Sequence, residues 1–391
     1  MKLLIYDWAS YYRYDIYAIL HNMGIEYDVF EYDFDIEGRS KHYDEEFINV
    51  FKNNYSSNDY DAIFSIAYWA VFSDAAMITG MKYISWSYDC PLDTEKPMRT
   101  LNNPCNFVFL FDKTQVDYYK SLGIETVYYM PLGINVERYT AYNESDNRSD
   151  RFRSDVSFVG SLYIGSINGI KSVVSDRTRT VMEQIVETQK RLPGQYILDK
   201  IITDEFINML NKEIEEINPG IKGNLSRPNT ANTFAYEVTS YNRMMLLMLL
   251  GKRYKTTLYT NSKIDVLNNV IVKKSINYYD EMPWCFAGTK INLNSTFISI
   301  QTGLPLRVLD IMGCGGFLLS NRQAEFETLG YIDGEDVALF TDFGEAIEKA
   351  EYYINNDDVR RRVARNGRKK VYENANMKDK LSKILLISGL K

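Results

Sequence analysis

The first part of the chain alternates short apolar segments with stretches long enough for a helix. Residues 2–6 have the pattern of a buried strand, and residues 14–23 carry apolar side chains at helical spacing. Residues 26–31 alternate apolar and polar side chains, as a strand does. Further strand-like segments follow at residues 61–65, 82–86, 107–111 and 126–130. Strands separated by helix-length connections predict a parallel, doubly wound sheet over residues 1–140.

A second series of strands follows a polar, charged stretch without periodicity at residues 141–154, which we predict to be an interdomain linker. Its first strand begins at Asp155, and a mostly helical block over about 177–250 comes next. Later strand-like segments lie at residues 256–260, 270–272, 290–294, 317–320 and 338–340. This order predicts a second α/β domain over residues 155–374, with helices inserted after its first strand.

The end of the chain, residues 343–386, is nearly all helical in pattern, and we expect residues 375–391 to pack back toward the first domain. This part contains a basic run at residues 360–370. We favour a solvated helix face balanced by neighbouring acidic residues, because charge runs usually solvate a face. Peripheral contact with an anionic membrane surface or a polyanionic acceptor is the alternative.

Composition narrows the class of protein. The chain has 391 residues, 45% of them hydrophobic, and a formal net charge of −7, which argues against nucleic acid as a ligand. Its 4 cysteines show no CxxC spacing and its 2 histidines have no partner nearby in sequence, so we predict no metal site. No apolar run reaches membrane-spanning length and the first residues do not resemble a signal peptide, so we expect a cytoplasmic protein. The oligomeric state stays open.

Residues 301–321 carry the clearest chemical signal. They read as loop, helix, turn and strand, with Pro305 at the first helical position. A helix N-terminus that follows a strand and a glycine-containing loop is a ready anion site. Arg307 falls in the first turn of this helix, and Asp310 falls one turn later. Phosphate near the helix start and hydroxyl groups near the carboxylate would suit a sugar nucleotide. No GxGxxG follows the first strand, which disfavours an NAD site.

Several segments together carry a resemblance to a known family. They are residues 83–91, 107–112, 128–133, 155–162, 290–294, 301–321 and 333–336. As a set they resemble the GT-B glycosyltransferases, and more closely the bacterial group around the spore maturation protein CgeB, whose C-terminal half looks like a retaining glycosyltransferase. The resemblance implies two Rossmann-like domains that face a cleft, with the acceptor on the side of residues 1–140 and the donor bound by residues 155–374.

The resemblance also implies a donor site in the second domain. A loop would face the diphosphate, a tyrosine pair would line the base, two asparagines would end the strand beneath the donor, and a carboxylate would bind the ribose. These residues are, in chain order, Gly160 and Ser161, then Tyr278 and Tyr279, then Asn292 and Asn294, then Thr302, Gly303 and Asp310.

Two positions depart from the family pattern. Thr302 stands where relatives have a glutamate, and Ser161 stands where many have an arginine. A diphosphate leaving group still needs a cation. Arg307 is our candidate and Arg177 a second one, because the planar guanidinium can make two hydrogen bonds to phosphate. The alternatives are structural: an ion pair between Arg307 and Asp310, or a carboxylate that only favours the helix dipole.

The acceptor side is less clear in the sequence. Asp7 and Asp89 each follow a strand of the first domain, where ligands of open α/β sheets collect. Either carboxylate could deprotonate an acceptor hydroxyl in an inverting reaction, or be an ordinary loop or capping aspartate.

The sequence thus predicts a metal-independent, hexosyltransferase-type glycosyltransferase without a cofactor. Its donor would be a nucleotide-diphosphate sugar, with UDP the expected carrier, and its acceptor a protein or a cell-surface or spore glycan. One alternative is a non-catalytic protein that binds a nucleotide sugar or glycan. Another is a metal-dependent GT-A enzyme, suggested by the DxD triplets Asp33–Asp35 and Asp59–Asp61.

Overall fold

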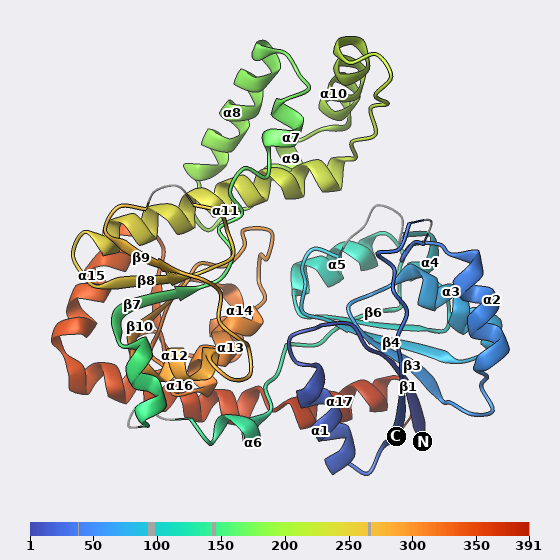
Figure 1. Ribbon diagram of the computed structural model, residues 1–391, viewed down its shortest axis with the longest axis horizontal. Coiled ribbons are helices and arrows are strands. Elements are labelled where there is room, and N and C mark those ends of the chain that lie inside the picture. Colours follow the sequence, from blue (N-terminus) through green and yellow to red (C-terminus); the bar gives the residue numbers. More distant parts are fainter. Residues whose placement is uncertain (38, 93–97, 143–145, 265–266, 391) are drawn as a thin grey trace. The chain divides into compact units, whose positions relative to one another are not determined.

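The chain forms two compact units in a computed structural model that describes residues 1–37, 39–92, 98–142, 146–264 and 267–390 (Figure 1). The first unit comprises Met1–Tyr139, Thr302–Leu306 and Tyr372–Lys391. The second unit comprises Thr140–Gln301 and Arg307–Val371. The chain therefore passes between the units at four places rather than at a single linker.

The first unit is built on a six-stranded sheet in the order β2-β1-β3-β4-β5-β6, with every neighbouring pair parallel. Parallel strands are covered by helices on both faces, so β3 and most of β4 are buried along their length. The strands are β1 (Lys2–Tyr6), β2 (Glu26–Phe30), β3 (Ala62–Ile66), β4 (Lys82–Ser87), β5 (Asn106–Leu110) and β6 (Val127–Tyr129). The helices are α1 (Arg13–Asn22), α2 (Glu45–Asn54), α3 (Ala70–Thr79), α4 (Met98–Leu101), α5 (Lys113–Ser121) and α6 (Val136–Tyr139).

Aromatic side chains fill one face of this first sheet. The ring of Tyr6 lies 4.7 Å from Phe72 and 5.4 Å from Phe30, and Phe30 lies 5.6 Å from Phe51. Such tilted and edge-to-face contacts stabilise a core beyond the area they bury. These aromatic side chains are therefore part of the core of the first unit.

The second unit is built on a six-stranded parallel sheet in the order β12-β11-β10-β7-β8-β9. Its strands are β7 (Ser154–Val159), β8 (Thr256–Tyr259), β9 (Val270–Lys273), β10 (Thr289–Asn294), β11 (Leu318–Asn321) and β12 (Ala338–Phe340). Its later helices are α12 (Met282–Gly288), α13 (Leu306–Gly313), α14 (Ala324–Thr328), α15 (Phe343–Asn355) and α16 (Asp357–Asn374). The two doubly wound sheets predicted from the sequence are confirmed.

A helical insertion separates β7 from β8. It comprises α7 (Asn168–Lys171), α8 (Asp176–Lys190), α9 (Leu198–Ile201), α10 (Asp204–Ile217) and the long α11 (Arg227–Gly251). Figure 1 shows α7 to α10 gathered beside the outer part of α11, away from the second sheet, while the other end of α11 reaches that sheet. The predicted insertion is therefore present and is anchored to the sheet through α11.

The stretch expected to be a linker is ordered on both sides of residues 143–145, which lie outside the described residues. Asn147–Phe152 form a 3₁₀ helix, η1, and a Cβ on Gly288 of α12 would lie 2.5 Å from the carbonyl oxygen of Ser149. This close approach explains why glycine occupies position 288. The polar sequence of the stretch encodes a short packed helix and not a free connection.

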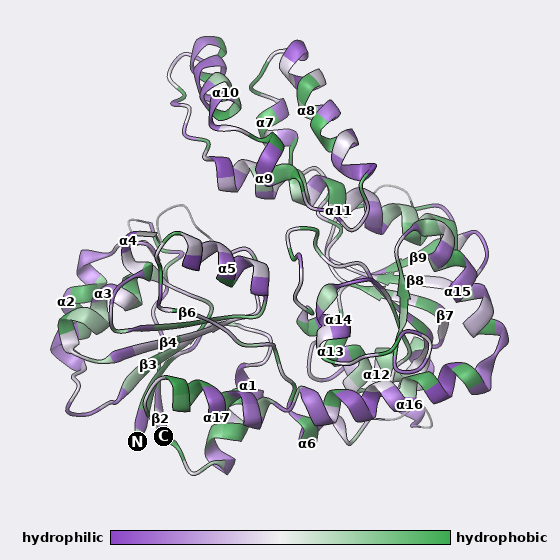
Figure 2. Ribbon diagram, turned by 180° about the vertical axis from the view of Figure 1, so that it is seen from behind, coloured by the Kyte–Doolittle hydropathy of each residue, from purple (hydrophilic) through white to green (hydrophobic). Residues whose placement is uncertain are grey.

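The last helices connect the two units. Helix α16 begins in the second unit, and its residues from Tyr372 onward belong to the first, together with α17 (Met377–Ile387). Both helices alternate hydrophilic and hydrophobic residues, as one-sided packing requires (Figure 2). Ile134 donates its N–H to Ala375 at 2.8 Å and accepts from Met377 at 2.9 Å, which fixes α17 on the first unit.

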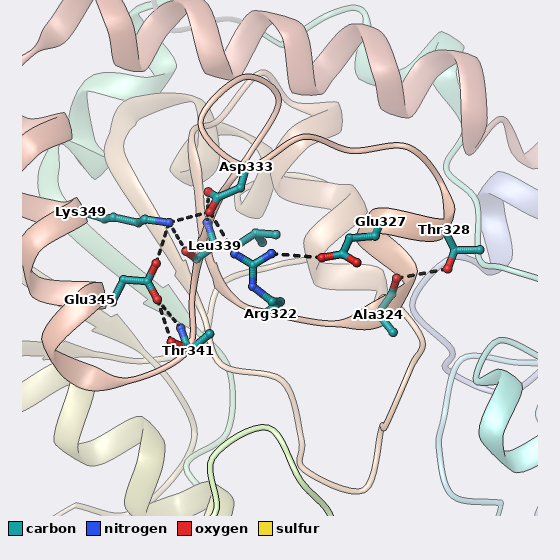
Figure 3. Close-up of polar contacts among 9 residues, drawn as sticks. All are labelled: Arg322, Ala324, Glu327, Thr328, Asp333, Leu339, Thr341, Glu345 and Lys349. Atoms are coloured by element: carbon teal, nitrogen blue, oxygen red, sulfur yellow. Dashed lines mark hydrogen bonds and ion pairs between the residues drawn. The ribbon is translucent and has the colours of Figure 1, made fainter.

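A polar network holds the segment between β11 and β12, where the family resemblance had pointed to residues 333–336 (Figure 3). The Asp333 carboxylate accepts from Lys349 at 2.7 Å and from Arg322 at 3.1 Å. Lys349 also pairs with Glu345 at 3.0 Å. These contacts give the segment a structural role that joins β11, β12 and α15.

Candidate functional site

The second sheet has a topological switch point between β7 and β10. After β7 the chain moves to β8 and β9 on one side of the sheet, and it returns to the other side at β10. Connections leave in opposite directions at such a point and open a crevice at the carboxyl ends of the strands, where ligands of α/β folds bind. The loops at this point are residues 160–163, called here the β7 loop, and residues 295–297 after β10.

Short-range hydrogen bonds shape the β7 loop. The N–H of Gly160 donates to the Tyr259 carbonyl at 3.0 Å, and that of Leu162 donates to the Ser262 hydroxyl at 2.9 Å. The Ser161 hydroxyl accepts from the N–H of Tyr163 at 3.2 Å. Tyr163 has a φ of 55°, a left-handed conformation that is costly for a bulky residue and concentrates at functional sites.

Arg243 of α11 bridges the two loops at the switch point. Its guanidinium donates to the carbonyl oxygen of Ser161 at 2.7 Å and to that of Ser295 at 2.8 and 3.0 Å. Its carbon Cζ lies 4.7 Å from the centre of the Tyr163 ring. The side chain is 8% exposed, and this desolvation lowers its pKa below the usual arginine range. Within the described chain no carboxylate pairs with it.

Arg307 of α13 contacts the end of β7, directly before the same loop. Its Nη1 donates to the carbonyl oxygen of Val159, the last residue of β7, and its guanidinium lies 5.7 Å from the Phe286 ring. Its buried Nε has no hydrogen-bond partner among the described residues. Nor does it form an ion pair with Asp310 there, so the structural alternative considered for Arg307 is not observed.

Asp310 lies one turn further along α13 and is 2% exposed. Its Oδ1 accepts from the Tyr278 hydroxyl at 3.0 Å, and the ring of Tyr279 stands at 88° to that of Tyr278 with 4.9 Å between their centres. Asp310 and the tyrosine pair are therefore in contact. The sequence had assigned all three to the donor site but predicted no contact between them.

Asn292 and Asn294 are buried and their amides are engaged within the protein. Asn292 accepts from Ser157 at 3.1 Å and donates to the Phe286 carbonyl at 2.9 Å. Asn294 donates to the hydroxyls of Thr296 at 3.0 Å and Ser320 at 2.9 Å. Both residues tie β10 to its surroundings at the switch point, and the NH2 group of each is hydrogen-bonded within the protein.

Thr302 and Gly303 belong to the first unit. The Asp112 carboxylate accepts from their N–H groups at 2.8 and 3.1 Å, and the Thr302 hydroxyl accepts from the N–H of Lys113 at 3.0 Å. Asp112 also caps α5 by accepting from Gln115 at 3.1 Å. Thr302 therefore completes the N-terminus of α5, a role for which a hydroxyl suffices.

Arg177 lies near the start of α8 and is exposed. Its neighbours Ser175 and Thr178 bond to Glu213 of α10, with donor–acceptor distances of 3.0 and 2.6 Å. No described hydrogen bond or ion pair joins Arg177 to the β7 loop. The structure therefore associates Arg243, and not Arg177, with Arg307.

Sequence reasoning missed Arg243 because it lies in the helical insertion, more than 80 positions after the β7 loop that it binds. The available signal was a single charged residue on a face of α11 whose neighbouring buried residues, among them Ser240, Leu246 and Leu247, are uncharged. Such a residue can be buried only if it is fully hydrogen-bonded or meets an anion.

The candidate acceptor residues lie at the carboxyl ends of strands of the first unit. Asp7 follows β1 and accepts from Arg13 at 3.0 Å, and Asp89 follows β4. Trp8 and Tyr88, their neighbours in sequence, stack at 6.3 Å, so both carboxylates fall at one end of the sheet. Asp89 keeps an exposed surface, but the protein packed around its carboxylate desolvates it and raises its pKa above the usual aspartate range, while Lys41 acts against this rise.

Two features are absent from the part of the chain that the structure describes. No group of three or more His, Cys, Asp or Glu side chains is arranged to hold a metal ion there. No helix in that part of the chain has the length and apolar character needed to cross a membrane.

Comparison with known proteins gives the same fold. Residues 240–385 match the family model described as glycosyl transferase-like. Sucrose-phosphate synthase from Thermosynechococcus elongatus is similar over 100% of this chain and 99% of its own, with a TM-score of 0.58 and 10% identity. A glycosyltransferase from Rickettsia africae ESF-5 is similar over 99% and 97%, with a TM-score of 0.57 and 9% identity. No curated protein sequence matches the chain.

The Anabaena protein HepE, solved in complex with UDP-glucose, is similar over 100% of this chain and 99% of its own, with a TM-score of 0.53 and 11% identity. These likenesses, with the two parallel six-stranded sheets, show that the chain has the GT-B glycosyltransferase fold. The GT-A alternative is therefore wrong. In the DxD triplets that suggested it, Asp33 accepts from the N–H of Asp35 and Asp61 accepts from that of Lys2, both as local structure.

Proposed function

We propose that the protein is a glycosyltransferase whose donor, a nucleotide-diphosphate sugar, binds at the switch point of the second sheet. Arg243 and Arg307 would face the diphosphate, the Asp310 carboxylate would bind the ribose, and Tyr278 and Tyr279 would line the base. The Tyr278 hydroxyl donates to Asp310, so nucleotide binding would replace that hydrogen bond with one from a ribose hydroxyl.

One observation carries the proposal: two guanidinium groups meet at the end of β7 without a carboxylate partner among the described residues. Each donates to a backbone carbonyl there, which leaves its charge uncompensated. Departure of a nucleoside diphosphate builds negative charge on the leaving group, and donors already fixed in place stabilise that charge. The two arginines would thereby replace the cation that Ser161 cannot supply.

The finer assignments belong to the same proposal. The HepE complexes with UDP and UDP-glucose favour UDP as the carrier nucleotide. A hexose is the sugar we propose, and two arginines at the diphosphate would make a metal ion unnecessary. Asp7 or Asp89 would accept the proton of an acceptor hydroxyl on a protein or glycan. Membership of the CgeB-like group rests on the sequence resemblance.

A nucleotide panel tests the donor site. Binding of a ligand to the folded state raises the melting temperature, so UDP, GDP, ADP and CMP should each be titrated in a thermal-shift assay. We expect UDP to raise the melting temperature of the wild-type protein and to have little effect on Arg307→Ala. If no nucleotide shifts either protein, the donor site is wrong.

Hydrolysis separates an enzyme from a binding protein. Thr302, which has the uncharged hydroxyl that caps α5 in place of a glutamate, is the observation that favours a protein that binds without turnover. We expect slow release of UDP from UDP-hexose in the absence of acceptor. Nucleotide binding without any such release, at any pH, would favour the binding protein.

A further inference from the structure

A basic cavity lies at the amino ends of the strands of the second sheet, whereas the proposed donor site lies at their carboxyl ends. It has a volume of about 680 Å³ and is lined by residues at the amino ends of β7, β10 and β11 and by one face of α16. Strands of six residues span about 20 Å, so this cavity is separate from the switch point at the carboxyl ends. None of its lining residues belongs to the proposed donor site.

Helix α16 contributes a row of arginines to this cavity. Arg361, Arg365 and Arg368 follow one another at intervals of four and three residues, which places them on one face of the helix. Ala364, between them, leaves the space open, and Arg360 completes the lining from this helix. The basic run at residues 360–370, for which the sequence allowed either a solvated face or contact with an anion, therefore lines one side of a cavity.

Residues at the amino ends of the strands add further basic groups to the cavity. Arg153 precedes β7, Lys255 precedes β8 and Lys290 lies at the start of β10, and all three line the cavity. In total the lining has seven basic and two acidic side chains, although the whole chain has a net charge of −7. A local excess of positive charge in an acidic protein indicates attraction of an anion.

Acidic side chains neutralise only part of this charge. Arg153 pairs with Asp150, which does not line the cavity, at 2.6 Å. Asp155 pairs with Lys290 at 2.7 Å, and Asp357 pairs with Arg361 at 2.7 Å and also with Arg360. Arg365 is exposed and has no hydrogen bond or ion pair to any described residue. Its guanidinium is therefore available to a ligand at little cost in lost protein contacts.

We propose that this cavity binds a phosphate-bearing anion, independently of the glycosyltransferase proposal. Arginine pairs with phosphate through two parallel hydrogen bonds, and several guanidinium groups around one hollow suit a group with more than one phosphate. The anion could be a free polyphosphorylated metabolite or the headgroup of an anionic lipid. Both present the same chemistry to the cavity.

The test uses two probes with the full-length protein in 0.15 M salt. Inositol hexakisphosphate, followed by calorimetry, represents the free anion, and phosphatidylglycerol vesicles, followed by cosedimentation, represent the lipid. Arg365→Glu should weaken binding of the relevant probe about tenfold or more, because it replaces an attraction by a repulsion. Arg362→Glu is the matched control: Arg362 is exposed on the same helix but does not line the cavity.

The outcomes separate the sources and the two proposals. Binding of one probe that Arg365→Glu weakens and Arg362→Glu spares supports the cavity and identifies the source. Arg307→Ala should leave this binding unchanged, so failure of the donor site does not affect it. Absence of binding to both probes, or equal losses in both glutamate variants, would overturn the proposal.

Discussion

The two arginines at the end of β7 would supply the positive charge that the proposed diphosphate requires. Ser161 cannot neutralise a diphosphate, and Arg243 reaches the same loop from a helix that is remote in sequence. Burying a guanidinium is costly unless its donors are satisfied, and carbonyl oxygens satisfy hydrogen bonds without neutralising charge. The positive charge of the two guanidinium groups would therefore be available to attract a phosphate.

Replacing Arg307 by alanine tests its role at the transition state. We expect Arg307→Ala to lower the rate of UDP-hexose hydrolysis by about 10²–10³, the usual cost of losing one fixed donor to a leaving group. Arg307→Lys should retain part of the rate. Arg253→Ala is the control, because Arg253 is exposed, lies just after the end of α11 and pairs with Glu351 at 3.3 Å. Unchanged hydrolysis by Arg307→Ala would remove Arg307 from the site.

Asp89 should impose a pH dependence on transfer. A base must be ionised to act, so kcat/KM should fall as pH drops through the pKa of the catalytic carboxylate. Burial raises the pKa of Asp89, so the fall should lie above the ordinary aspartate range of about 4. Asp89→Asn should remove this acidic limb along with most of the activity. A limb that persists in Asp89→Asn would favour Asp7 instead.

At the scale of elements, the loop before α13 is tied to the N-terminus of α5. Asp112 is 1% exposed and accepts from both helix and loop, so one carboxylate fixes two segments far apart in sequence. Gly303 lies so close to β5 that an added Cβ would be 2.6 Å from Cδ2 of Phe111 and 2.8 Å from its carbonyl oxygen. Position 303 therefore requires glycine for space.

This packing predicts the effect of a methyl group. Gly303→Ala should lower the free energy of unfolding by about 1–3 kcal/mol, the usual cost of overpacking. Gly169→Ala is the matched control, since an added Cβ there meets nothing within 4 Å and the residue lies in helix α7. Urea denaturation of both variants measures the difference. Equal stability of the two variants would contradict the close approach at Gly303.

The elements were largely predictable, and the reasons are local. Apolar residues are nearly continuous in β1 and β3 and recur at every second position in β4 and β10, so these strands could be placed within a residue or two. Pro305 was expected inside the helix and instead precedes it, since α13 begins at Leu306. The 3₁₀ helix η1 was missed because its polar, charged sequence has no periodicity. Its position depends on packing against α12.

The site was only partly predictable, because its members come from distant segments. Asp310 and Tyr278 could each be selected by motif, but the hydrogen bond between them could not be predicted from the sequence. Arg243 carried no motif at all. Asn292 follows the pattern of a ligand-binding residue near the end of a strand. The sequence does not reveal that its amide is hydrogen-bonded to Ser157 and Phe286.

For the whole molecule, the proposed charge balance predicts independence from divalent metal. Two arginines without a carboxylate partner among the described residues would neutralise the diphosphate. UDP-hexose hydrolysis should therefore proceed at full rate in excess EDTA. A loss of activity in EDTA that Mg²⁺ or Mn²⁺ restores would show that the arginines are insufficient.

The central claim is that a nucleoside diphosphate binds at the switch point of the second sheet. The most direct measurement is a crystal structure of the protein with UDP. We predict phosphate oxygens within about 3 Å of the guanidinium nitrogens of Arg243 or Arg307, with the ribose at Asp310. UDP bound elsewhere, or a diphosphate that contacts neither arginine, would contradict the account.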